Sequence, residues 1–100
     1  MHFLIWGAGA IGGTIGAYLA RAGHAVVFVD RDTAHVDAIN RSGLAITGPI
    51  AEFTVSAQAF TPDTLDGQYS TVLLCVKAQD TGSAMRGLVP HLAPDGYVVS

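Results

Sequence analysis

Three glycines near the N-terminus have the spacing of a phosphate-binding turn, G-x-G-x-x-G. The pattern is formed by Gly7, Ala8, Gly9, Ala10, Ile11 and Gly12. In such a loop the first glycine permits a tight turn out of a strand, the second lets a pyrophosphate approach the backbone, and the third lets a helix pack closely. The helix N-terminus then offers free N–H groups and the positive end of its dipole to phosphate. The run therefore predicts a dinucleotide site made by these six residues.

An acid and a base further along the chain bear on which dinucleotide would bind. Asp30 lies 18 residues after Gly12, close to the roughly 20-residue spacing of an acid that accepts hydrogen bonds from the adenosine ribose. Such an acid favours NAD, because a carboxylate repels a 2′-phosphate. Arg31 favours NADP, since a guanidinium pairs with phosphate and stacks on adenine, although it could equally be a solvated residue or a partner of Asp32. On Asp30 and Arg31 alone NAD is slightly favoured, and both cofactors remain open.

Lys77 is the single lysine of the chain and follows its most apolar run, Thr71–Val76. An ammonium group there could hydrogen-bond a nicotinamide ribose or attract an anionic substrate, and the alternative is a solvated lysine at a strand end. Asp80 or Thr81, just beyond it, is expected to cap the following helix.

The elements that must position these side chains follow from the apolar pattern. Short apolar runs predict strands, and apolar residues three or four apart predict helices. The predicted strands are Phe3–Trp6, Ala25–Val29, Thr71–Val76 and a run from Tyr97, and the predicted helices run from Ala10 towards Gly23, from Thr33 to Arg41 and from Asp80 towards Leu92. This alternation predicts an α/β fold with a Rossmann-type doubly wound, mostly parallel sheet. Its ligand site would lie beyond the carboxyl ends of the strands, where Gly7, Asp30 and Lys77 fall.

Local signals refine these elements. The spacing of three and four predicts one apolar face of the first helix, formed by Ile11, Ile15, Tyr18, Leu19 and Ala22. Asp32 or Thr33 is expected to cap the second helix and Gly43 to end it, while Gly23 ends the first. Pro90 is expected to stop the third helix near Val89, and Pro94-Asp95-Gly96 predicts a turn. The runs Leu44–Ile46 and Ala51–Val55 predict either an antiparallel excursion or one bent strand.

Composition excludes several classes of function. The basic residues are scattered, which argues against a nucleic-acid partner; they are Arg21, Arg31, Arg41, Lys77 and Arg86. No apolar run is long enough to span a bilayer, and no basic stretch precedes the first apolar residues as in a signal peptide. A single cysteine, Cys75, excludes an internal disulfide and fits a cytoplasmic location. The four histidines are dispersed, so no metal site is predicted.

Several of these segments together resemble the N-terminal domain of the ketopantoate reductase family. The resemblance rests on Gly7–Gly12, Gly23-His24, Asp30-Arg31, His35–Ile39 leading to Gly43-Leu44, Val76-Lys77-Ala78 and Val98-Val99-Ser100. It extends over essentially all 100 residues. The glycine pattern is shared by many dehydrogenases, and the lysine–alanine pair is more discriminating.

The resemblance implies an NADPH-dependent reduction of 2-dehydropantoate, a small 2-oxo acid, to pantoate on the route to pantothenate and coenzyme A. It implies that Arg31 meets the 2′-phosphate and that Lys77 reaches the nicotinamide side, whereas Asp30 departs from the NADP pattern. It also implies that residues 1–100 form an N-terminal dinucleotide-binding domain, incomplete at its C-terminal end. The family's catalytic lysine and substrate-binding glutamate lie on a helical C-terminal domain, so no catalytic residue is expected here. A homodimer, if formed, would use that domain.

Two other hypotheses for the function remain open. One is another NAD(P)-dependent dehydrogenase of 2-hydroxy acids or opines with the same opening residues. The other is a nucleotide-sensing regulatory domain of a potassium transport system. Lys77-Ala78 and the antiparallel-looking region 44–55 argue against the regulatory domain.

Overall fold

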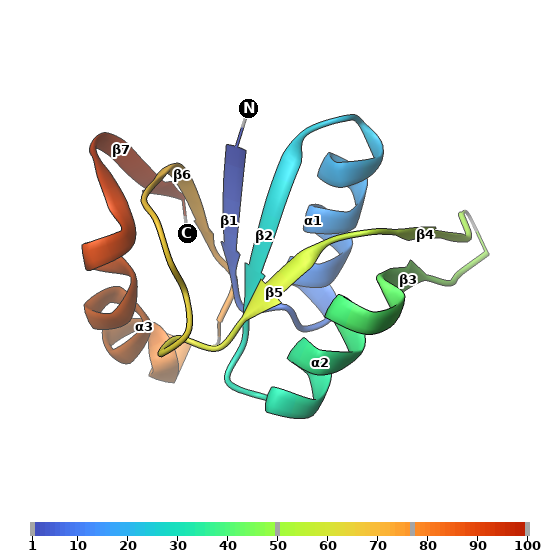
Figure 1. The fold of residues 1–100 in the computed structure, drawn as a ribbon, viewed down its shortest axis with the longest axis horizontal. Coiled ribbons are helices and arrows are strands. Elements are labelled where there is room, and N and C mark those ends of the chain that lie inside the picture. The colour runs from blue at the N-terminus through green and yellow to red at the C-terminus, as the bar shows by residue number, and fades with distance from the viewer. Residues whose placement is uncertain (1, 50, 77, 100) are drawn as a thin grey trace.

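A five-stranded parallel sheet runs through the molecule (Figure 1). The computed structural model describes residues 2–49, 51–76 and 78–99. The strands are β1 (His2–Trp6), β2 (Ala25–Val29), β5 (Gln58–Phe60), β6 (Tyr69–Leu74) and β7 (Leu92–Val99). Their spatial order is β5-β2-β1-β6-β7, and every neighbouring pair is parallel. The predicted doubly wound fold is therefore confirmed.

The direction of winding reverses at β1. From β1 the chain moves outward through β2 to β5, and then crosses back to place β6 on the other side of β1. Ligands of open parallel sheets bind beyond the carboxyl ends of the strands at such a reversal. The ends of β1, β2 and β6 are thus where a site is expected.

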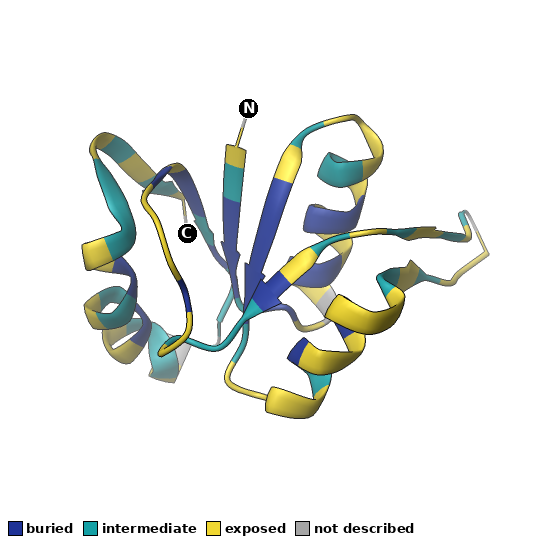
Figure 2. Cartoon of the chain, in the orientation of Figure 1, coloured by how far each residue is buried: buried dark blue, intermediate teal, exposed yellow. Residues whose placement is uncertain are grey.

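Helices cover both faces of the sheet. Helices α1 (Ala10–Arg21) and α2 (Thr33–Ser42) lie on one face, and α3 (Thr81–Leu88) lies on the other (Figure 1). Because side chains alternate along a strand, Ile5 and Phe28 enter the α1–α2 core, while Leu4 and Val29 enter the α3 core. Strands β1 and β2 are buried along most of their length (Figure 2).

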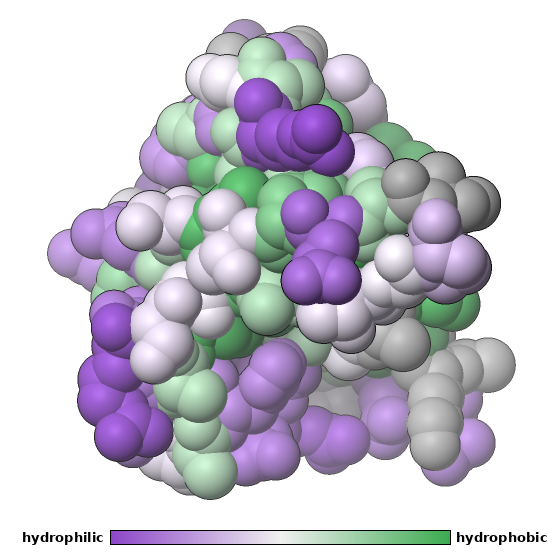
Figure 3. All heavy atoms as spheres, turned by 90° about the vertical axis from the view of Figure 1, so that its right-hand side faces the viewer, coloured by the Kyte–Doolittle hydropathy of each residue, from purple (hydrophilic) through white to green (hydrophobic). Residues whose placement is uncertain are grey.

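Most of the predicted apolar face of α1 points outward, although Leu19 is partly buried and packs against the core. Ile11, Ile15 and Tyr18 are 72%, 41% and 42% exposed. The residues turned inward are small and buried: Gly12, Gly13, Gly16 and Ala17. Large side chains cannot fit where a helix backbone lies this close to a strand, so the glycines form the packing face. Apolar atoms consequently show between hydrophilic ones on the face that carries α1, α2 and β4 (Figure 3).

A small hairpin packs against part of that outward face. Strands β3 (Leu44–Ile46) and β4 (Phe53–Val55) pair antiparallel, so the antiparallel alternative is confirmed. The Phe53 ring packs edge-on against Tyr18 at 5.1 Å between centroids, and the Arg21 guanidinium lies 4.6 Å from the Phe53 centroid. The hairpin thus lies on α1, outside the main sheet.

The ends of α1 and α2 follow their predicted signals. Gly23 and Gly43 have φ angles of 98° and 78°, which favour glycine. The Asp32 carboxylate accepts hydrogen bonds from the N–H groups of Ala34 and His35, so it is the predicted cap of α2. This cap starts α2 immediately after Asp30 and Arg31.

Strand β5 was not predicted, because its three residues carry little apolar signal. Asn40 of α2 explains how so short a segment is held. Its amide nitrogen donates to the Ala59 carbonyl, and its amide oxygen accepts from the Ala59 N–H, both at 2.9 Å. These bonds satisfy the outer edge of the sheet with a side chain, which leaves no free edge at Ala59.

The predicted turn at Pro94-Asp95-Gly96 is wrong, and β7 begins at Leu92 rather than Tyr97. Leu92 is opposite Tyr69 and Tyr97 is opposite Thr71, so the intervening segment of β7 bulges. A bulge accommodates Pro94, which has no N–H for the ladder. Helix α3 ends at Leu88, and Pro90 lies in a short 3₁₀ turn, Val89–His91, as its ring requires.

No helix in the described parts of the chain is long and apolar enough to cross a bilayer.

Two glycines of α1 offer a matched test of the packing between helix and sheet. A Cβ on Gly16 would overlap the Phe28 ring, whereas a Cβ on Gly13 would meet only ordinary contacts, the nearest being the Ala8 carbonyl oxygen at 3.4 Å. We expect Gly16→Ala to lower the free energy of unfolding by about 1–3 kcal/mol. Gly13→Ala should leave it unchanged or raise it by up to roughly 1 kcal/mol. Urea denaturation measures both, and equal effects would contradict the packing argument.

Candidate functional site

A cleft of about 650 Å³ opens at the carboxyl ends of the strands, within the usual size of small-molecule sites. It is formed by the ends of β1, β2 and β6 and by the beginning of α3. Its lining includes Trp6, Gly7, Gly9, Val29, Asp30, Arg31, Pro62, Cys75, Val76, Gln79, Asp80 and Ser83. The cleft lies at the reversal between β1 and β6, as the topology requires.

The three glycines of the loop are required for different reasons. Gly7 has a φ of 105°, and a Cβ there would strike the Cys75 carbonyl oxygen. A Cβ on Gly12 would collide with the Gly7 carbonyl oxygen. Gly9 is different, because no atom beyond its two chain neighbours lies within 4 Å of the place its Cβ would take. The fold itself needs glycine at positions 7 and 12, and position 9 keeps the wall of the cleft open for a ligand.

The turn out of β1 is held by its neighbours on both sides. The Gly7 N–H donates to the Val29 carbonyl at 2.7 Å, and the Cys75 N–H donates to the Trp6 carbonyl at 2.8 Å. These bonds continue the ladders of β2 and β6 to the last residue of β1. The loop therefore leaves the sheet from a rigid base.

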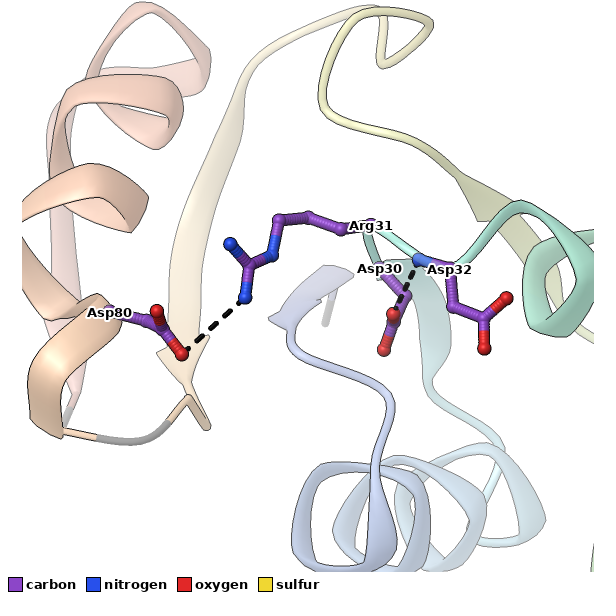
Figure 4. A network of polar contacts seen from close by, with 4 residues as sticks. All are labelled: Asp30, Arg31, Asp32 and Asp80. Atoms are coloured by element: carbon purple, nitrogen blue, oxygen red, sulfur yellow. Dashed lines mark hydrogen bonds and ion pairs between the residues drawn. The ribbon is translucent and has the colours of Figure 1, made fainter.

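The peptide groups of Ala8 are bound from both directions by side chains that follow β2. The Ala8 N–H donates to Asp30 Oδ2 at 3.0 Å, and His35 Nε2 donates to the Ala8 carbonyl oxygen at 2.7 Å. Asp30 Oδ1 accepts a second bond from the Asp32 N–H at 2.9 Å (Figure 4). These hydrogen bonds hold the loop that leads into α1 in one orientation.

Both carboxylate oxygens of Asp30 therefore already accept backbone N–H groups. The sequence predicted this carboxylate to bind ribose hydroxyls, and the structure gives it a second role, which is to orient the loop. Two N–H donors also offset part of its negative charge. Sequence reasoning assigned His35 no site role, because its contact with Ala8 depends on how α2 packs.

Arg31 extends from the end of β2 across the cleft (Figure 4). Its side chain is 73% exposed, and Nη2 lies 3.4 Å from Asp80 Oδ2. The alternative partner, Asp32, instead caps α2. Asp80 occupies the N-cap position of α3, but its carboxylate makes no capping bond and turns to Arg31 instead.

The predicted site residues fall into distinct groups. Gly7, Gly9, Asp30 and Arg31 line the cleft, and Ala8 and Gly12 are buried behind it. Ala10 begins α1, and the Ile11 side chain is exposed to solvent. Lys77 lies outside the described residues.

Cys75 is half-buried and lines the cleft. Burial raises the pKa of its thiol, so the group stays neutral near pH 7. Trp6 and Ser83 also line the cleft without having been predicted to do so. Among the described residues, no group of three histidine, cysteine or acidic side chains could hold a metal ion.

A parallel sheet reversing at β1, with a glycine loop between β1 and a helix N-terminus, defines the Rossmann-type class of nucleotide-binding domains. Comparison with models of protein families then shows to which family the chain belongs. The family model described as ketopantoate reductase PanE/ApbA matches residues 3–100, and the chain belongs to this family. This membership argues against the regulatory domain of a potassium transport system.

Individual proteins similar to this chain support the same family assignment. The chain is 36% identical to the 2-dehydropantoate 2-reductase of Pyrococcus abyssi, over all of this chain and 32% of that protein. A crystal structure of a PanE/ApbA family ketopantoate reductase from Ralstonia eutropha JMP134 superposes with a TM-score of 0.90 at 38% identity, covering 100% of this chain and 33% of that one. The chain thus spans about a third of the length of these relatives.

A D-mandelate dehydrogenase, solved with NADH and anilino(oxo)acetate, has the same fold. Its TM-score is also 0.90, at 24% identity, over 98% of this chain and 32% of that one.

His35 provides a test of the pre-oriented loop. We expect His35→Ala to weaken dinucleotide binding roughly two- to tenfold, because one hydrogen bond that orients the loop is lost. His91→Ala is the matched control, since His91 Nδ1 makes the same kind of bond to the Gly67 carbonyl at 2.8 Å, outside the cleft residues. Quenching of Trp6 fluorescence in the full-length polypeptide measures both. Equal affinities for the two variants would show that His35 does not support the loop.

Proposed function

We propose that this chain is the dinucleotide-binding domain, residues 1–100, of a reductase that uses NADPH to convert 2-dehydropantoate to pantoate. The observation that carries the proposal is the preformed loop at the N-terminus of α1, where Gly9 faces open space inside the cleft. Membership of the ketopantoate reductase family supports the substrate, a small 2-oxo acid. The P. abyssi relative is named for the same reaction.

The residues present fit a nicotinamide dinucleotide. Backbone N–H groups at the beginning of α1 would hold the pyrophosphate, and the end of β2 would hold the adenosine half. The other half would lie towards Cys75, Val76 and the start of α3, the side on which the family resemblance places Lys77. The cofactor would supply the hydride that the keto carbon receives.

The arrangement at the end of β2 favours NADPH over NADH. Each carboxylate oxygen of Asp30 accepts a hydrogen bond from a backbone N–H, which offsets part of its negative charge. Arg31 is 73% exposed at the cleft, and its ion pair with Asp80 is weak, because solvent screens an exposed pair. A guanidinium in this position suits a 2′-phosphate, which it can bind with two parallel hydrogen bonds.

The role of this chain is to bind and orient the dinucleotide, since none of residues 1–100 is proposed to donate a proton to the substrate. The neutral thiol of Cys75 and the ring of Trp6 give the cleft apolar walls, which would keep water from the reacting end of a bound cofactor. The proton donor and the substrate carboxylate's partner belong to the helical domain that the resemblance implies. A cytoplasmic location and a homodimer built through that domain complete the proposal.

A second candidate is a 2-hydroxy acid dehydrogenase that uses NADH. It is favoured by the presence of Asp30 at the end of β2, the usual acid of NAD sites. The D-mandelate dehydrogenase solved with NADH has the same fold.

An assay of the full-length polypeptide separates the two candidates. We expect NADPH oxidation with 2-dehydropantoate at a higher kcat/KM than with phenylglyoxylate, the 2-oxo acid related to mandelate. The same assay with NADH should be slower. A preference for phenylglyoxylate with NADH would favour the second candidate, and no turnover with either acid would refute the proposed function.

Arg31 should distinguish the cofactors by affinity. We expect Arg31→Ala to weaken NADPH binding by about 1.5–3 kcal/mol, because a charge-assisted pair with the 2′-phosphate is lost, and to change NADH binding much less. Arg41→Ala is the control, since Arg41 is exposed at the far end of α2. Calorimetric titration measures each affinity. An equal loss for both cofactors would mean that Arg31 does not bind the 2′-phosphate.

A further inference from the structure

The cleft has an unusual distribution of charge. Among its described residues three side chains are charged: Asp30, Arg31 and Asp80. Asp30 is engaged by two backbone N–H groups, which leaves Asp80 as the carboxylate that acts on Arg31. Asp80 comes from the opposite wall, at the beginning of α3, so the ion pair joins the two sides of the cleft (Figure 4).

The position of Asp80 is not explained by helix capping. A carboxylate at the N-cap ordinarily accepts N–H groups of the first turn, and the Asp80 carboxylate accepts none. It is only 30% exposed, and its Oδ2 lies 3.4 Å from Arg31 Nη2. In this geometry the guanidinium is directed towards α3 and away from Asp30 and Asp32, as Figure 4 shows.

A 2′-phosphate would have to compete with Asp80 for the same guanidinium. An ion pair with an arginine that is 73% exposed is weak, so a doubly charged phosphate would displace the carboxylate. The displaced Asp80 would then lie near a second anion, which costs further binding energy. A cofactor without the 2′-phosphate meets neither cost, because Arg31 can remain paired.

We infer that Asp80 is a specificity-determining residue, which lowers the preference for NADPH over NADH by competing with the 2′-phosphate for Arg31. The inference rests on the proposed function and adds to it a residue from the far wall of the cleft. Asp80 acts through Arg31 and is therefore a positioning residue.

The test compares Asp80→Asn with the parent in the full-length polypeptide. The probes are NADPH and NADH, together with adenosine 2′,5′-bisphosphate and AMP, which isolate the 2′-phosphate from the nicotinamide half. We expect the variant to bind NADPH and the bisphosphate about three- to tenfold more tightly, and NADH and AMP within about twofold of the parent. The gain should shrink as salt is added, because exposed charges are screened.

Two further variants keep the test specific. Asp95→Asn removes the same charge from an exposed position in β7 outside the cleft lining and should change neither affinity. In an Arg31→Ala background, Asp80→Asn should lose most of its selective gain, because the group for which Asp80 competes is absent.

Each outcome decides between the proposals. An unchanged NADPH-to-NADH ratio in Asp80→Asn, or weaker NADPH binding, overturns the role of Asp80 while the proposed function stands. If the parent binds neither dinucleotide nor the adenosine probes, the proposed function and the inference both fail. A selective gain that persists without Arg31 would also overturn the inference, because simple charge repulsion would then explain it.

Discussion

The peptide groups of Ala8 are the point on which the site depends. Their N–H is bound by Asp30 and their carbonyl oxygen by His35, so one loop residue is tied to the end of β2 and to α2. Ala8 itself is 2% exposed, where an unpaired polar group would be costly. The direction in which the N–H groups of α1 point therefore follows from contacts made by another part of the chain. A binding loop that is oriented in advance spends less binding energy on ordering.

Close packing of α1 on the sheet is the second requirement for the loop. Gly12 and Gly16 lie against the Gly7 carbonyl and the Phe28 ring, which lets the helix N-terminus approach the end of β1. Ile11, Ile15 and Tyr18 of α1 lie on the outside, where the β3–β4 hairpin packs against Tyr18. The same short distance thus explains the glycine content of the helix, its exposed isoleucines and the position of the hairpin.

The elements with strong local signals were predictable. Strands β1 and β2, helices α1 and α2, and their caps at Asp32, Gly23 and Gly43 depend on neighbouring residues in sequence. Strand β5 and the bulge of β7 were not predictable, because they depend on distant partners. β5 is held by Asn40, and the bulge is set by pairing with β6. The buried face of α1 was missed because glycine carries no hydrophobic signal.

The sequence by itself determined the fold class, the glycine loop and the presence of an acid and an arginine at the end of β2. These follow from residue type and spacing, since turn geometry and amphipathic period are local properties. Only the tertiary structure decided what those side chains contact. Asp30 and His35 reach Ala8 across 22 and 27 residues, and Arg31 meets Asp80 on the opposite wall. Such partners are chosen by the packing of helices on the sheet, and no short-range pattern encodes that packing.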